Sequence, residues 1–145
     1  MAQRTPVIGL DTNILVRYIT QDDPVQSRQA AEILENQLSE EEPGFVSLVV
    51  MAETVWVLER VYGLQALELA NAVEKILQLA VLSVQNEPDV FQAMVALRVG
   101  AGTFSDALIA SVGLSAGCST TLTFDRKATR IRGFQLPGGE LPRKM

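Results

Sequence analysis

The chain has 145 residues, of which 48% are hydrophobic and 20% are charged, and its formal net charge is −5. A chain of this size and composition can bury its own core, and we predict a single domain over residues 1–145. The acidic balance argues against a protein that grips nucleic acid over a broad basic surface.

The sequence contains no histidine and one cysteine, Cys118. This composition excludes Ser/His and Cys/His nucleophile pairs, an intrachain disulfide and a multi-cysteine zinc site. Cys118 lies among small residues, and we expect it to have a structural role. Any bound metal must therefore have oxygen ligands, which favours Mg²⁺ or Mn²⁺.

Neither end of the sequence nor its apolar segments indicate membrane attachment. Residues 1–6 lack the apolar stretch of a signal peptide. The longest uncharged run, between Asp106 and Asp125, contains six Ser or Thr residues and two glycines. That composition favours a helix, a turn and a strand over a membrane span. We expect a cytoplasmic protein.

The predicted elements alternate along the chain. In order they are strand 7–11, helix 12–18, helix 22–38, strand 45–47, helix 48–62, helix 65–79, strand 81–84, helix 87–100, helix 105–117 and strand 119–123.

Local signals set several of these boundaries. Thr12 and Asn13 are good helix-capping types, and two acids before Pro24 are typical of a helix start. Gly63 is placed to end the helix before it. Ser105 and Asp106 are expected to cap the last helix. The tail from about residue 137 is rich in Gly and Pro, and we expect it to be loose.

Short apolar strands that alternate with helices predict an α/β fold with a parallel sheet covered on both faces. Ligands bind at the carboxyl ends of the strands in such sheets. Asp11 and Asp125 each follow a predicted strand. We therefore expect the two carboxylates to lie together at that edge.

Four acids adjoin apolar segments, where an unpaired charge is costly. They are Asp11, Glu53, Asp106 and Asp125. Two carboxylates about 4 Å apart repel by roughly 4 kcal/mol at an effective dielectric near 20. Four that converge would require a cation. A metal bound there could activate a water molecule for phosphodiester cleavage.

Each acid also has a plainer interpretation. Asp11 and Asp106 could cap the helices that follow them, and Asp125 could be an ordinary turn residue. Glu53 is the hardest to explain in this way. It lies mid-helix among apolar residues, and the nearest following base on that helix, Arg60, is almost two turns away.

Four short segments occur together in a recognisable order: LDTNILVR at 10–17, AET at 52–54, FSDALIA at 104–110 and TLTFDR at 121–126. In these segments the chain resembles a PIN domain, most closely a VapC-type toxin of a toxin–antitoxin pair. The resemblance extends from Ile8 to about Phe134.

The resemblance implies a three-layer α/β/α sandwich with a central, mainly parallel sheet. It also implies a Mg²⁺- or Mn²⁺-dependent endoribonuclease that acts on RNA. The family's catalytic and metal-binding quartet corresponds to Asp11, Glu53, Asp106 and Asp125. Asn13 and Thr123 match polar residues that support the site.

Other residues suggest how the chain binds its partners. Arg17, Arg126 and Lys127 are candidate RNA contacts. Residues 48–79 carry more large apolar side chains than one core face needs, which favours self-association. VapC-type toxins commonly dimerise and are silenced by a cognate antitoxin that lies over the active-site groove. We therefore expect a homodimer and an antitoxin partner.

Three other classes fit less well. A haloacid-dehalogenase-like phosphatase needs a second aspartate where Asn13 stands. A response-regulator receiver domain needs paired acids after the first strand and a late lysine. A non-catalytic PIN-like RNA-binding or protein-interaction module would be favoured by missing acids or by basic patches. All four acids are present here, and the net charge is negative.

Overall fold

The computed structural model describes residues 5–6 and 8–143. Contacts divide the chain into two compact units, Met1–Glu87 and Pro88–Met145. The expectation of a single domain over residues 1–145 stays a prediction. The elements of the first unit are β1 (Ile8–Gly9), α1 (Thr12–Thr20), α2 (Pro24–Glu32), the π-helical turn η1 (Ile33–Gln37), β2 (Gly44–Val46), α3 (Leu48–Arg60), α4 (Ala66–Gln78) and β3 (Leu82–Val84).

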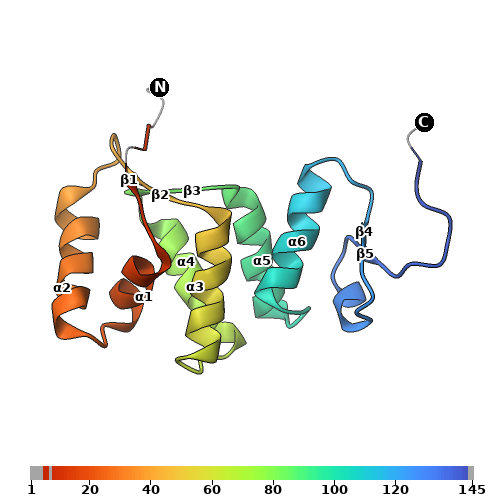
Figure 1. Cartoon of the computed structure of the whole chain (residues 1–145), viewed down its shortest axis with the longest axis horizontal. Coiled ribbons are helices and arrows are strands. Elements are labelled where there is room, and N and C mark those ends of the chain that lie inside the picture. The colour runs from red at the N-terminus through yellow and green to blue at the C-terminus, as the bar shows by residue number, and fades with distance from the viewer. Residues whose placement is uncertain (1–4, 7, 144–145) are drawn as a thin grey trace. The chain divides into compact units, whose positions relative to one another are not determined.

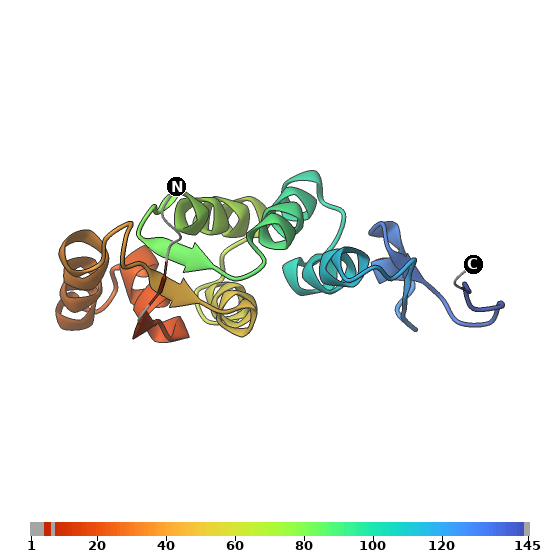
Figure 2. The same ribbon diagram turned by 90° about the horizontal axis from the view of Figure 1, so that it is seen from above.

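The first unit contains a parallel sheet in the order β1-β2-β3. Gly9 pairs with Phe45 of β2, and Phe45 pairs with Ser83 of β3. Both helical crossovers step in the same direction along this sheet. When successive crossovers are right-handed and step in the same direction, their helices lie on the same face of the sheet. In Figure 1, helices α1 to α4 lie below the strands. The arrows of β2 and β3 point the same way in Figure 2.

Capping residues explain where the first helices begin. Asp11 is the N-cap of α1 and accepts a hydrogen bond from the backbone of Thr12. The helix begins at Thr12 as predicted, and the plainer interpretation of Asp11 as its cap is confirmed; Thr12 and Asn13 are its first residues and not its cap. Asp23 caps α2 with Pro24 in its first turn, as predicted. Gly63 adopts a φ of 70° beyond the end of α3, a conformation that favours glycine.

The last turn of the second helix is wider than an α-helical turn. The Leu38 amide donates to the Ile33 carbonyl over 3.0 Å, a bond between residues five apart. The predicted helix 22–38 is thus α-helical to Glu32 and π-helical in its final turn. Glu40, Glu41 and Glu42 follow in a loop, as expected for a solvated charge run.

Large apolar side chains fill the core of the first unit. The fully buried ones include Leu15, Met51, Leu58, Leu69 and Ile76.

Not every large apolar side chain of the first unit is in the core. Trp56 is 53% exposed and Leu67 on α4 is 61% exposed, and both belong to the surplus of large apolar side chains predicted over residues 48–79. In a sheet covered on both faces the first strand would be buried, yet Ile8 is 52% exposed because β1 is at an edge of the described sheet. Val7 lies outside the described residues.

The second unit consists of α5 (Glu87–Val99, whose first residue belongs to the first unit), α6 (Phe104–Ser115), β4 (Thr121–Leu122), the 3-10 turn η2 (Lys127–Arg130) and β5 (Phe134–Gln135). Strands β4 and β5 pair in parallel. Thr103 is the N-cap of α6, so the prediction that Ser105 and Asp106 cap this helix is wrong. β5 was not predicted.

The α/β class with parallel strands, as in a PIN-like fold, is confirmed. Across the described parts of the chain, the helices are too short or too polar to span a bilayer.

Candidate functional site

Asp11 and Glu53 lie on one hollow in the first unit. Asp11 stands between β1 and α1, and Glu53 stands in the middle of α3. The hollow has a volume of about 340 Å³. We call it the acidic hollow, and its lining is Asp11, Thr12, Asn13, Val16, Arg17, Glu53, Val57, Val61 and Tyr62. The structure thus brings together two of the four predicted acids.

Thr12 links these two carboxylates. Its backbone amide donates to Asp11 Oδ1 over 2.7 Å, and its hydroxyl donates to Glu53 Oε1 over 2.5 Å. Thr12 is only 6% exposed, so its side chain is fixed by packing. Sequence reasoning missed this residue, although its place directly after Asp11 at a helix start was a signal.

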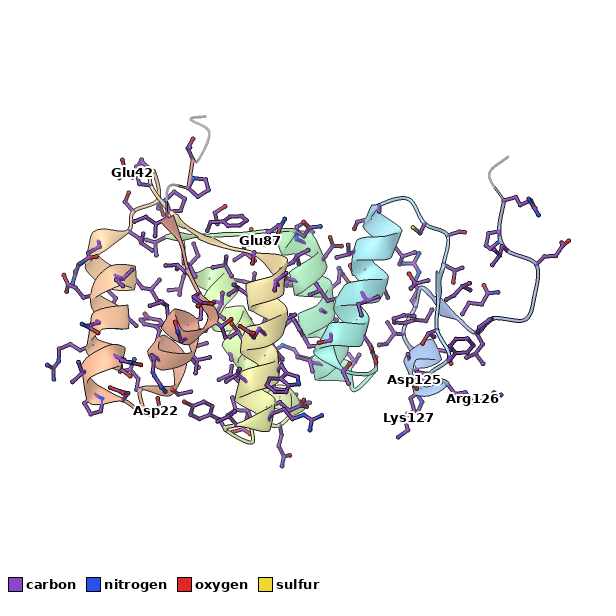
Figure 3. The ribbon with its side chains drawn as sticks, in the orientation of Figure 1. Asp22, Glu42, Glu87, Asp125, Arg126 and Lys127 are labelled. Atoms are coloured by element: carbon purple, nitrogen blue, oxygen red, sulfur yellow. The ribbon has the colours of Figure 1, made fainter. Side chains whose placement is uncertain are left out.

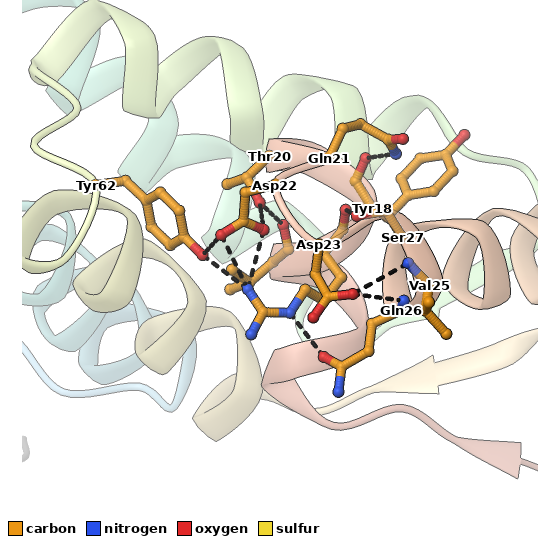
Figure 4. Close-up of polar contacts among 11 residues, drawn as sticks. Tyr18, Thr20, Gln21, Asp22, Asp23, Val25, Gln26, Ser27 and Tyr62 are labelled. Atoms are coloured by element: carbon orange, nitrogen blue, oxygen red, sulfur yellow. Dashed lines mark hydrogen bonds and ion pairs between the residues drawn. The ribbon is translucent and has the colours of Figure 1, made fainter.

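Arg17 lines the acidic hollow. It is held by a polar network whose members Asp22, Gln26 and Tyr62 are labelled in Figure 4. Its Nη1 donates to Asp22 Oδ1 at 2.9 Å and to the Tyr62 hydroxyl oxygen at 2.9 Å. Its Nε donates to Gln26 Oε1 at 2.8 Å. The Tyr62 hydroxyl in turn donates to Asp22 at 2.6 Å. Three parts of the unit are joined in this way: α1, the start of α2, and the turn after α3.

The network changes the acidity of its members. Hydrogen bonds from Tyr62 and Thr20, followed by that from Arg17, lower the pKa of Asp22 from 3.8 to about 2. The same Asp22 contact raises the pKa of Arg17 above its usual value. Arg17 is therefore a fixed positive charge beside Asp11 and Glu53. Its contact with RNA stays a prediction.

A larger hollow of about 630 Å³ lies against α1, α2 and η1. We call it the amide hollow, and its lining is Asn13, Ile14, Arg17, Gln26, Arg28, Gln29, Glu32, Ile33 and Gln37. Asn13 and Arg17 line both hollows, so the two cavities adjoin. No sequence pattern had indicated this cavity.

Asp106 and Asp125 belong to the second unit. Asp106 lies half-buried in the first turn of α6, and its backbone amide donates to the hydroxyl of Thr103 at 3.1 Å. Asp125 is exposed after β4, and its backbone amide donates to Thr123 Oγ1 at 3.0 Å. This bond orients the backbone at Asp125, and the supporting role of Thr123 at the site stays a prediction.

Asp125 also begins the η2 turn, because its carboxylate accepts from the Lys127 amide at 2.9 Å. The interpretation of Asp125 as a turn residue is therefore confirmed. Arg126 and Lys127 are exposed beside it, as Figure 3 shows. Both side chains are accessible to a phosphate, and their contact with RNA stays a prediction.

Most of the predicted acids are more solvated than the apolar sequence around them suggested. Asp11, Glu53 and Asp125 are exposed, and Asp106 is half-buried. The argument from the cost of burying an acid is therefore wrong for three of the four. Within either unit, the described residues contain no group of three or more acids or cysteines placed around a metal position. The convergence of all four acids stays a prediction.

Among the residues that the structure describes, the buried acid is Asp89 on α5, at 5% exposure. Its Oδ1 accepts hydrogen bonds from Ser111 at 2.7 Å and from Ser115 at 2.6 Å. These serines are four residues apart and share one face of α6. The carboxylate thereby fastens α5 to α6. Sequence reasoning assigned Asp89 only to a helix start.

The acidic hollow suits a hard divalent cation by its donor chemistry. Magnesium binds proteins through one or two carboxylates and keeps several waters. Asp11 and Glu53 supply two carboxylates, and Asn13 adds an amide oxygen on the same lining. The residues present therefore fit such an ion.

Comparison with known proteins gives one family. A family model described as PIN domain matches residues 8–133, which include all four predicted acids. No curated protein matches the chain.

Proposed function

Because the chain belongs to the PIN domain family, whose members are generally metal-dependent ribonucleases, we propose that it is an endoribonuclease that uses Mg²⁺ or Mn²⁺. The observation that best supports the proposal is the shared lining of Asp11 and Glu53, which come from different elements and face one hollow. Carboxylates so placed favour a cation between them.

The proposed mechanism assigns each residue a task. Asp11 and Glu53 would hold the ion through their carboxylates. The metal-binding roles of Asp106 and Asp125 rest on the family resemblance. When bound, the ion supplies a water of lowered pKa and neutralises charge on the leaving oxygen. Thr12 keeps the Glu53 carboxylate in one orientation through its hydroxyl.

The remaining residues bind and orient the substrate. Arg17 offers a fixed guanidinium that can pair with a phosphate of the RNA. Asn13 and Thr123 support the site, and Arg126 and Lys127 contact the backbone of the strand.

The decisive experiment incubates the purified chain with mixed cellular RNA in Mg²⁺, in Mn²⁺ or in EDTA, and maps the fragment ends. We expect cleavage with either metal and none in EDTA. Asp11→Asn and Asp106→Asn should abolish cleavage, and circular dichroism should show that both remain folded. Glu59→Gln is the matched control, because Glu59 is an exposed acid on α3 outside the acidic hollow.

Full cleavage in EDTA, or by well-folded Asp11→Asn, would refute the mechanism. RNA binding without cleavage under any metal would instead favour a non-catalytic PIN-like module.

We further propose that the chain is the toxin of a toxin–antitoxin pair and forms a homodimer. The resemblance to VapC-type toxins supports this role. The exposed apolar residues Val49, Trp56 and Val61 on and after α3 are consistent with a contact surface. Co-expression with an adjacent small open reading frame should yield a complex that suppresses cleavage, and light scattering should give a dimer mass. If no complex forms and the mass is that of a monomer, the toxin and homodimer proposals fail, and the chain is a nuclease that acts alone.

A further inference from the structure

We propose that the amide hollow is a nucleotide subsite, which holds one base of the RNA strand next to the bond that is cut. The inference rests on the proposed ribonuclease function. In this proposal, residues of α1, α2 and η1 select that base. Their role is separate from the metal binding proposed for Asp11 and Glu53.

The side chains around the amide hollow match the parts of a nucleotide. Ile14 and Ile33 are half-buried and offer an apolar surface for the face of a base. Amide groups surround it, and they pair well with base edges because each carries a donor and an acceptor. These amides are Asn13, Gln26, Gln29 and Gln37.

The charge of the lining favours an anion. Arg17 and Arg28 provide two guanidinium groups against the single carboxylate of Glu32. Guanidinium groups bind phosphate oxygens in a bidentate manner. Among the described residues, Arg28 has no salt-bridge partner, whereas Arg17 is paired with Asp22. Arg28 can therefore bind a phosphate without giving up an ion pair, in addition to the phosphate contact proposed for Arg17.

One of the amides is held in a fixed orientation. Arg17 Nε donates to Gln26 Oε1 at 2.8 Å, which turns the oxygen of that amide towards Arg17. The NH₂ group of Gln26 consequently faces away from Arg17, as a donor. Because Arg17 is itself fixed by Asp22 and Tyr62, this orientation is set before any ligand arrives. A preorganised donor discriminates between bases better than a mobile one.

The position of the amide hollow relates it to the reaction. Asn13 and Arg17 belong to its lining and to that of the acidic hollow, so a strand can pass from one to the other. Its volume of about 630 Å³ is within the range of small-ligand sites. The π-helical turn contributes two members of its lining, Ile33 and Gln37, and such turns are frequent at functional sites.

The test uses the full chain and a short single-stranded RNA of randomised sequence. Arg28→Ala and Gln29→Ala are combined, because both residues are exposed on α2 and their loss should spare the fold. Gln78→Ala is the control, since Gln78 is exposed on α4 and lies outside both hollows. Fluorescence anisotropy in Ca²⁺ measures RNA affinity, Mn²⁺ titration measures metal affinity, and sequencing of the products measures base preference.

We expect the double variant to bind RNA about tenfold more weakly and to lose base preference at one position beside the cut. Its Mn²⁺ affinity should match that of wild type, and Gln78→Ala should behave as wild type throughout. If wild type cleaves RNA and the double variant keeps both affinity and preference, the subsite is refuted while the ribonuclease proposal stands.

Other outcomes are equally informative. If wild type neither binds Mn²⁺ nor cleaves, the ribonuclease proposal fails. The subsite is then judged on RNA anisotropy alone, where equal binding by wild type and double variant refutes it and weaker binding by the double variant supports it. If the double variant loses only the capture of a protein partner and binds RNA normally, the hollow is a protein-docking site and the inference is overturned.

Discussion

The Thr12 hydroxyl donates to Glu53 Oε1 across 2.5 Å, and so ties the first turn of α1 to the middle of α3. The two residues are 41 positions apart. The same threonine binds Asp11 through its backbone amide, at 2.7 Å. One buried residue therefore sets the positions of both acids on the acidic hollow.

Thr12→Val should weaken metal binding while it preserves the shape of the side chain. Loss of a hydrogen bond that orients a ligand typically costs about 10- to 100-fold in metal affinity. Thr12→Ser keeps the hydroxyl and should bind Mn²⁺ nearly as wild type does. Titration followed by electron paramagnetic resonance measures both constants. Equal Mn²⁺ affinity of the Val and Ser variants would show that the hydroxyl has no positioning role.

Mg²⁺ or Mn²⁺ should raise the melting temperature of the chain. A ligand that binds only the folded state stabilises it, by about 2.7 kcal/mol at a hundred times its dissociation constant. Glu53→Gln removes one charge from the acidic hollow and should reduce the shift markedly. Glu59→Gln, on the same helix but outside that hollow, should leave it unchanged. Identical shifts in all three proteins, measured by differential scanning calorimetry, would indicate a general ion effect.

Asp22→Asn should reduce stability at neutral pH but not in strong acid. The pKa of Asp22 is lowered in the folded state to about 2, so its ionised form favours folding. That contribution is complete above its ordinary pKa of 3.8 and disappears as the pH falls through about 2. Urea midpoints of wild type and variant should therefore differ at pH 7 and converge below pH 2.

Glu41→Gln, in the loop before β2, controls for the loss of a surface charge in this test. A difference between wild type and Asp22→Asn that persists unchanged at pH 2 would contradict the network's ionic character.

Asp89→Ala should destabilise the chain more than either serine substitution. It removes an acceptor that two hydroxyls share, and hydrogen bonds to charged groups contribute about 1.5–3 kcal/mol each. Ser111→Ala and Ser115→Ala should each cost roughly 1–3 kcal/mol in the free energy of unfolding. Denaturant unfolding measures all three, with Ser105→Ala as a surface control. A cost for Asp89→Ala no larger than for Ser105→Ala would show that the carboxylate does not fasten α5 to α6.

The parts of the fold that the sequence predicted are those with local signals. Asp23 and Pro24 mark a helix start within two residues, and Gly63 marks a helix end by its left-handed backbone. The helices over 48–62 and 65–79 were long enough for their apolar spacing to be recognised. By contrast, β5 has two residues, Phe134 and Gln135, which is too short for any periodicity.

The parts that the sequence could not predict depend on partners distant in the chain. Nothing near Thr12 indicates that its hydroxyl meets Glu53, and nothing near Asp89 indicates Ser111, 22 residues later. Burial was misjudged for a related reason. A helix such as α3 is apolar around most of its circumference, so sequence alone does not show which positions face solvent. Glu53 and Trp56 occupy that solvent-facing side.

The π turn at Ile33–Gln37 is equivalent to a one-residue insertion in an otherwise regular helix. Deleting Asn36, which is exposed, would allow the turn to close with a bond between residues four apart. Each residue of an α-helix turns by about 100°, so the deletion would rotate the earlier helix, with Gln29 and Arg28, relative to Leu38 in the core. The number of residues in this segment therefore determines which side chains line the amide hollow. A homologue one residue shorter here would present different side chains to its ligand.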